Sequence, residues 1–128
     1  MAENIDGTLA GYLIGKVEGV EENWHSHVSA LSVAPEFRRT GLAKRLMAYF
    51  EEISEEVHDN YFCDLFVRES NSVAVEFYKT CGYVVYRTVK GYYSGQEDAL
   101  DMRKPLRRDK DQRSIAHAGM EVAAADLL

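Results

Sequence analysis

The chain has 128 residues, of which 46% are hydrophobic and 28% are charged, so it has room for one globular domain with its own core. Its formal net charge of −6 argues against a protein that chiefly coats nucleic acid. No apolar run approaches the roughly 20 residues that cross a bilayer, and residues 1–4 do not resemble the start of a signal peptide, so we expect a cytoplasmic protein with no membrane partner.

The hydrophobic pattern predicts alternating strands and helices. Residues 27–33 alternate as a strand does until Pro35 stops them, and from Gly41 to Val57 the apolar residues recur every three to four positions, which indicates one face of a helix. Capping side chains precede a second, shorter helix that Gly82 ends. In chain order we expect strands at 9–17, 27–33, 61–67, 83–89 and 99–103, a helix at 41–57, and a helix between Ser72 and Gly82.

This order predicts an α+β fold (α/β three-layer) with a mixed central sheet flanked by helices. After Pro105 the composition becomes densely charged and then rich in alanine. We therefore expect the domain to cover residues 1–105 and residues 106–128 to form a flexible tail, with a possible weak helix near its end.

A basic loop lies between the second predicted strand and the first helix. Its sequence is Arg38-Arg39-Thr40-Gly41-Leu42-Ala43, followed by Lys44. The first N–H groups of a helix have no intrahelical partner and attract anions, and a glycine lets a diphosphate approach the backbone. The loop is either such a phosphate site or a solvated basic loop before a surface helix, and its position between strand and helix favours the phosphate site.

A second motif reads Asn71-x-x-Ala74-x-x-x-Tyr78-x-x-x-Gly82-Tyr83. Asn71 is placed to cap a helix, and this cap alone is its simplest role. Tyr78 lies one turn after Ala74 on the same face, so it either packs in the core or, as a phenol that stays protonated at neutral pH, donates a proton to a leaving thiolate.

The two motifs in this order resemble the acetyl-coenzyme A site of the GCN5-related N-acetyltransferase (GNAT) superfamily. The segments HVSALSVAPEFRR, DLFVRESN, YRTV, GYYSG and DMRK resemble, more narrowly, the catalytic subunits of NatB-type N-terminal acetyltransferases. The NatA-type subunits share the basic loop and the tyrosine but lack DLFVR and YRTV. The resemblance covers about residues 7–109 and implies an N-acetyltransferase domain with the GNAT fold.

The resemblance implies how the coenzyme is bound. The backbone of Leu31, Ser32 and Val33 would bind the pantetheine arm, and Asn71 and Tyr78 would lie beside the coenzyme's amide and sulfur. The pyrophosphate would be held by Arg38, Arg39, Thr40, Gly41, Leu42, Ala43 and Lys44.

It also implies the acceptor side. His27, Ser29, Phe66, Asn71, Tyr92 and Tyr93 would contact a peptide or protein N-terminus that begins Met-Asp, Met-Glu, Met-Asn or Met-Gln. Transfer would be direct, within a ternary complex of enzyme, acetyl-CoA and peptide. An auxiliary NatB subunit and the ribosome are the implied partners, with no direct contact to nucleic acid.

Tyr78 is the candidate general acid, and His27 is the candidate orienter or water-mediated base. An α-amino group has a pKa near 8, so no strong base is required. A strand-end histidine that only bonds the backbone is an equally good interpretation of His27. We expect no metal, because His25 and His27 lack further ligands nearby, and we expect Cys63 and Cys81 to be reduced, buried thiols rather than a disulfide or a reactive site.

In the family that the chain resembles, a strand, two helices and a second strand come before the strand that we expect at 9–17, and the resemblance implies that this chain lacks them. That region supplies part of the acceptor groove and of the auxiliary-subunit surface. The chain is then a shortened gene product or isoform, an artificially shortened fragment, or a chain whose sheet another chain completes. The rival function is a non-catalytic acetyl-CoA-binding module that serves assembly or regulation.

Overall fold

The computed structural model describes residues 2–3, 9–34, 38 and 40–123. The strands are β1 (Ala2–Glu3), β2 (Leu9–Glu18), β3 (His25–Val33), β4 (Phe62–Arg68), β5 (Val84–Tyr93), β6 (Glu97–Pro105) and β7 (Met120–Ala123). The α-helices are α1 (Leu42–Glu56) and α2 (Ser72–Thr80), and two single-turn 3₁₀ helices are η1 (Glu21–Asn23) and η3 (Arg113–Ile115).

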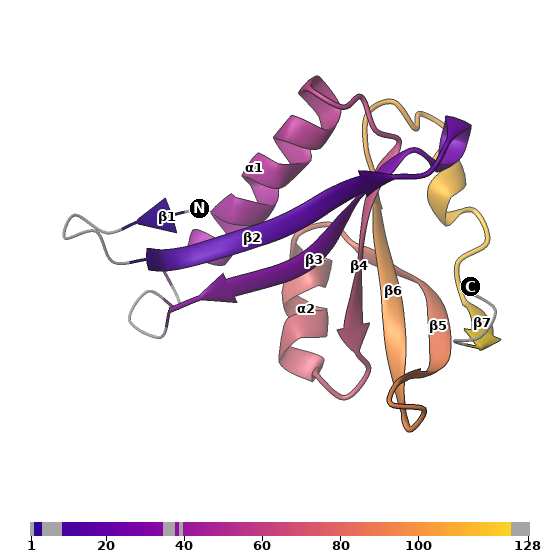
Figure 1. Ribbon diagram of the computed structural model, residues 1–128. Coiled ribbons are helices and arrows are strands. Elements are labelled where there is room, and N and C mark those ends of the chain that lie inside the picture. Colours follow the sequence, from indigo (N-terminus) through magenta and orange to yellow (C-terminus); the bar gives the residue numbers. More distant parts are fainter. Residues whose placement is uncertain (1, 4–8, 35–37, 39, 124–128) are drawn as a thin grey trace.

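The seven strands form one sheet in the order β1-β2-β3-β4-β6-β5-β7. The β3–β4 and β5–β7 pairs are parallel, and the other pairs are antiparallel. Helix α1 makes the crossover that a parallel β3–β4 pair requires (Figure 1). The predicted α+β class with a mixed sheet is confirmed, as are the two helices and the five predicted strands, with shifted ends.

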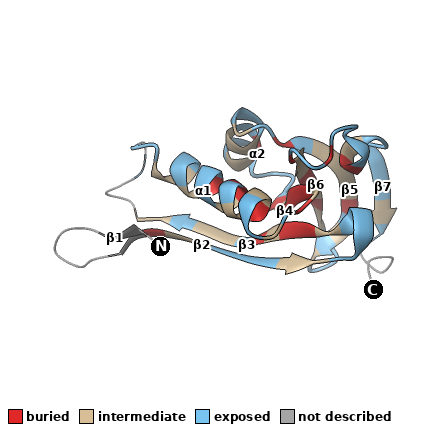
Figure 2. Ribbon diagram, turned by 90° about the horizontal axis from the view of Figure 1, so that it is seen from above, coloured by how far each residue is buried: buried red, intermediate tan, exposed pale blue. Residues whose placement is uncertain are grey.

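Both α-helices lie on the same face of the sheet, and the core fills the space between (Figure 2). Met47 of α1 and Val75 of α2 are buried against the inward residues of β3, β4 and β6, which include Val28, Leu65 and Met102. The spacing of Met47, Glu51 and Ser54 defines the buried stripe of α1. Val57, which the apolar pattern placed on that stripe, is 71% exposed because it follows the last helical residue.

A buried carboxylate joins α1 to the far side of the domain. Glu51 accepts hydrogen bonds from the Tyr83 hydroxyl and from Lys104 Nζ, each at 2.8 Å. Burial of a carboxylate is costly unless it is paired, and here a cation and a phenol pair it. The contact fixes the helix against Tyr83, which directly precedes β5, and against β6, both more than 30 positions away in sequence.

Residues 106–123 fold onto the sheet, which differs from the predicted flexible tail after Pro105. Leu106 is 4% exposed and belongs to the core cluster. Asp109 accepts hydrogen bonds from the Ser114 hydroxyl and from the backbone N–H of Arg113, and β7 pairs in parallel with residues 87–90 of β5. The charged composition wrongly indicated a flexible tail, because the charged side chains of this segment form local caps and ion pairs. Met120–Ala123 form a strand, and residues 124–128, at the end where a weak helix was predicted, lie outside the described residues.

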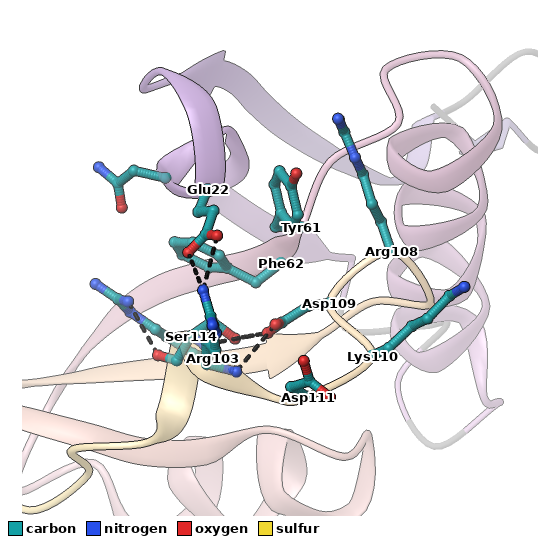
Figure 3. A pocket seen from close by; sticks show the side chains of 11 residues that line it. Glu22, Tyr61, Phe62, Arg103, Arg108, Asp109, Lys110, Asp111 and Ser114 are labelled. Atoms are coloured by element: carbon teal, nitrogen blue, oxygen red, sulfur yellow. Dashed lines mark hydrogen bonds and ion pairs between the residues drawn. The ribbon is translucent and has the colours of Figure 1, made fainter.

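Residues of the segment 108–114 line one part of an open pocket of about 490 Å³ at the end of the sheet where β3 and β4 begin. Figure 3 shows several charged side chains around it. Arg113 Nη1 lies 2.9 Å from Glu22 Oε1, and Arg103 stacks over the Phe62 ring at 4.5 Å. None of the site residues predicted from the sequence lines this pocket. In the described part of the chain, no helix is both long and apolar enough to span a bilayer.

Replacing Leu106 by alanine tests whether this segment belongs to the fold. We expect Leu106→Ala to lower the free energy of unfolding by about 2–4 kcal/mol, because it leaves a cavity in the core. The exposed neighbour Arg107 provides the control, and Arg107→Ala should change stability by less than about 1 kcal/mol. Urea unfolding followed by circular dichroism measures both, and equal, small effects would contradict the fold of this segment.

Candidate functional site

The site begins where two parallel strands separate. The β3–β4 ladder ends at the Val28–Leu65 pair, although β3 continues to Val33 and β4 continues to Arg68. Figure 1 shows the two strands diverging, with α2 beside the gap. Backbone groups of β3 after Val28 therefore face an opening rather than β4, and a strand edge of this kind can hydrogen-bond an extended ligand.

An elongated pocket of about 810 Å³ follows the far end of β3. It is lined by the end of β3, the basic loop, the first turn of α1 and one side of α2. Among the predicted coenzyme residues it brings together Leu31, Ser32, Val33, Arg38, Gly41, Leu42, Ala43, Lys44 and Asn71. Thr40 is exposed and precedes this lining, and Arg39 lies outside the described residues.

The first turn of α1 is arranged to receive an anion. Gly41 occupies the N-cap with φ of 82°, in the left-handed region that glycine adopts without strain, and no atom lies within 4 Å of where its Cβ would be. Arg45 N–H makes the first intrahelical bond, to Gly41 O, so the N–H groups that precede it have no partner within the helix. Arg38 lies alongside, with Nε donating to Val33 O at 3.2 Å.

A smaller pocket of about 360 Å³ occupies the gap between β3 and β4. It is lined by Val28–Leu31 and Leu65–Arg68, and by Asn71, Ala74, Tyr78 and Tyr93. Leu31, Asn71 and Ala74 line both pockets, so the two spaces adjoin. Asn71 caps α2, because its side chain accepts a hydrogen bond from the Ala74 N–H at 3.2 Å, and it lies at the junction as well.

Tyr78 lines the smaller pocket from α2. Burial raises its pKa above the ordinary value, and the neighbouring Cys81 and Tyr93 raise it further. The phenol is therefore fully protonated at neutral pH and can donate a proton. Its ring also contacts Phe77 and Tyr83 edge-on, so the two interpretations of Tyr78, packing and proton donation, are compatible.

The predicted acceptor residues gather into an aromatic cluster next to the smaller pocket. The Phe66 ring meets His27 edge-on at 5.6 Å and Tyr92 edge-on at 4.9 Å, and Tyr92 stacks on Tyr93 at 5.1 Å. Ser29 is exposed and lines the same pocket. The structure thus places His27, Phe66, Tyr92 and Tyr93 in contiguous contact, although they come from three strands.

His27 has a carboxylate partner that the sequence analysis missed. His27 Nδ1 lies 2.8 Å from Asp64 Oδ1, and this hydrogen bond is the largest cause of a raised His27 pKa. A signal was present, since Asp64 is the one charged residue within the apolar run Tyr61–Val67. The interpretation of His27 as a backbone-bonded histidine does not fit this contact. It suits His25, whose Nδ1 lies 2.6 Å from Asn23 O.

The two cysteines are free thiols, Cys63 buried and Cys81 half-buried. Burial raises the pKa of Cys63 to about 12, so it is not a reactive thiolate. Among the described residues, no three His, Cys, Asp or Glu side chains gather as a metal site.

Comparisons with known proteins agree with this geometry. A family model described as the acetyltransferase (GNAT) family matches residues 2–83. N-alpha-acetyltransferase 20 of Dictyostelium discoideum is 63% identical over 115 residues, which cover 90% of this chain and 66% of that protein.

Two solved structures are also similar. Naa20 of Chaetomium thermophilum in complex with a bisubstrate analogue matches with a TM-score of 0.91 and 38% identity, over 99% of this chain and 76% of that one. A NatB acetyltransferase complex bound to CoA and MES matches with a TM-score of 0.74 and 38% identity, over 83% of this chain and 71% of that one.

The chain spans 66% of the length of its Dictyostelium relative, just under two thirds. The family match covers most of the chain, including the basic loop, the gap between β3 and β4, and α2. The chain therefore belongs to the GNAT family of acetyltransferases.

Proposed function

We propose that the chain is an N-terminal acetyltransferase of the NatB type. It transfers acetyl from acetyl-CoA to the α-amine of proteins or peptides that begin Met-Asp, Met-Glu, Met-Asn or Met-Gln. The observation that carries the proposal is the junction at Leu31, Asn71 and Ala74, where the pocket at the N-terminus of α1 adjoins the pocket lined by Tyr78. The similarity to N-alpha-acetyltransferase 20 supports acetylation of an α-amine.

The site residues divide the work between donor and acceptor. The α1 N-terminus and Arg38 hold the pyrophosphate, and the free side of β3 at Leu31–Val33 holds the pantetheine arm. The aromatic cluster of His27, Phe66, Tyr92 and Tyr93 receives the peptide, with Ser29 and Asn71 nearer the gap. Two substrates bound in adjoining pockets can react directly, without a covalent enzyme intermediate.

The reaction exchanges one bond for another. A new N–C bond forms between the amine and the acetyl carbonyl carbon, and the C–S bond of the thioester breaks. Tyr78 donates its phenolic proton to the departing sulfur, and the amine's proton passes to His27, directly or through water. Because the α-amine has a pKa near 8, a histidine is a sufficient base at neutral pH.

The proposal includes partners and a compartment. The NatB complex among the similar structures supports an auxiliary subunit as partner. The ribosome is a further proposed partner, since N-termini emerge there, and the chain would then act in the cytoplasm. The rival function, an acetyl-CoA-binding module without turnover, predicts coenzyme binding alone.

The direct test combines calorimetric titration of acetyl-CoA with an assay of thiol release. We expect saturable binding, and thiol release with a peptide that begins Met-Asp but none with the same peptide blocked at its α-amine. The assay is run with the chain alone and with an auxiliary subunit. Binding without release in both cases would favour the module, and no binding would reject both functions.

Arg38→Gln tests the pyrophosphate site. Charge-assisted hydrogen bonds contribute about 1.5–3 kcal/mol, so the dissociation constant for acetyl-CoA should rise by about tenfold or more, and its dependence on salt should weaken. Arg45→Gln is the matched control, because Arg45 lies in the first turn of α1, close to the basic loop in sequence, but does not line the pocket. Equal effects of the two substitutions would indicate only a general loss of positive charge.

Tyr78→Phe tests the general acid. We expect kcat to fall by about a hundredfold or more, with less than about a twofold change in the dissociation constant for acetyl-CoA. Tyr49→Phe is the control, because Tyr49 is 63% exposed on α1, away from the site, and should have no effect. Equal losses of turnover and binding in Tyr78→Phe would show that Tyr78 only packs.

A further inference from the structure

Asp64 is a buried carboxylate on the sheet face opposite the helices. It is 6% exposed, and its β4 neighbours Cys63 and Leu65 point to the helical face instead. Three basic residues are its neighbours: His27, with Nδ1 at 2.8 Å, His25, with Nε2 at 3.7 Å, and Arg103, its register partner on β6. Burial of a carboxylate costs free energy unless the carboxylate is hydrogen-bonded or paired with a cation.

Of the three, His27 makes the strong interaction. His25 already has a partner, because its Nδ1 donates to Asn23 O and its ring stacks on Phe62 at 4.6 Å. Arg103 is also engaged elsewhere, with Nη1 donating to Ser114 O and its guanidinium stacked over Tyr86. The short, aligned hydrogen bond of Asp64 therefore belongs to His27.

We propose that Asp64 is a positioning residue for His27: its carboxylate accepts the Nδ1–H of His27, which fixes the tautomer, leaves Nε2 as the basic nitrogen, and holds the ring edge against Phe66. The inference rests on the proposed function, in which His27 receives a proton from the acceptor amine. A neutral imidazole carries one proton, and the hydrogen bond made by one nitrogen decides which nitrogen remains basic.

The charges around His27 determine its basicity. Asp64 on β4 raises the pKa of His27 most, and Glu18 on β2 raises it further, whereas burial and Lys16 on β2 lower it. Phe66 contributes an uncharged ring edge. A higher pKa of the His27 imidazole lies closer to the pKa of the acceptor amine, and this favours proton transfer from the amine to the imidazole.

The test is Asp64→Asn, whose amide oxygen can still accept the Nδ1–H bond but carries no charge. In NMR titrations with labelled histidine, the His27 midpoint should move down by about one pH unit relative to the wild type. The acidic limb of kcat/KM against pH should move the same way, and kcat should fall about tenfold or more. The dissociation constant for acetyl-CoA should stay within about twofold, since Asp64 does not line its pocket.

Asp101→Asn is the matched control. Asp101 is fully buried on β6, but it pairs with Arg87 at 2.7 Å rather than with a histidine. Asp101→Asn should leave the His27 midpoint unchanged. Thermal unfolding of both variants distinguishes a loss of the fold from a change in the position of the His27 ring. Asp64→Glu restores the charge and should return the midpoint part of the way.

Two results would overturn the proposed role of Asp64. An unchanged His27 midpoint in Asp64→Asn, or a shifted midpoint with an unchanged kcat/KM profile, would overturn the proposal. If Asp64→Asn does not fold, a double-mutant cycle with His27→Gln and Asp64→Glu replaces it. Non-additive losses of kcat in this cycle would support the proposal, and additive losses would reject it. The titration needs no turnover, so a chain that acetylates no peptide would reject the proposed function while the Asp64–His27 relation is still measured.

Discussion

The separation of β3 from β4 after the Val28–Leu65 pair is the constraint on which the site depends. A parallel pair normally continues to the end of the shorter strand, but here five residues of β3 lie beyond the last pair. The opening leaves backbone groups of β3 free for a ligand and makes room for α2 (Figure 1). Leu31, Asn71 and Ala74 line both adjoining pockets, so donor and acceptor can meet there.

The two faces of the sheet carry different kinds of side chains. The face toward the helices is apolar and holds the core cluster, with Glu51 as a paired exception that joins α1 to Tyr83 and Lys104. The opposite face carries the ionisable residues, with Asp64 between His25 and His27. Strand alternation brings this about, because neighbouring residues of β4 point to opposite faces. Stability and proton handling thus depend on different side chains of the same strands.

Periodicity and motifs predicted the elements that are defined locally. The repeat in residues 41–57 predicted α1, Pro35 and Gly82 marked where elements end, and the basic loop and Asn71 motif indicated residues that the fold does bring to one pocket. Contacts between distant residues were missed. No periodic pattern in the sequence indicates β7, which forms only by pairing with β5. The same holds for the Asp64–His27 and Glu51–Lys104 pairs. Residues 106–123 were misjudged for the same reason, since Leu106 is one apolar residue among charges whose partners lie elsewhere.

The proposed function requires that the opening beside β3 receives acetyl-CoA. Hydrogen–deuterium exchange with and without acetyl-CoA tests it most directly, because it reports on backbone amides one segment at a time. We expect slower exchange in residues 29–33 and in the first turn of α1, and no change in residues 108–114 around the pocket of Figure 3. Protection confined to residues 108–114, or no protection in residues 29–33 at saturating acetyl-CoA, would contradict it.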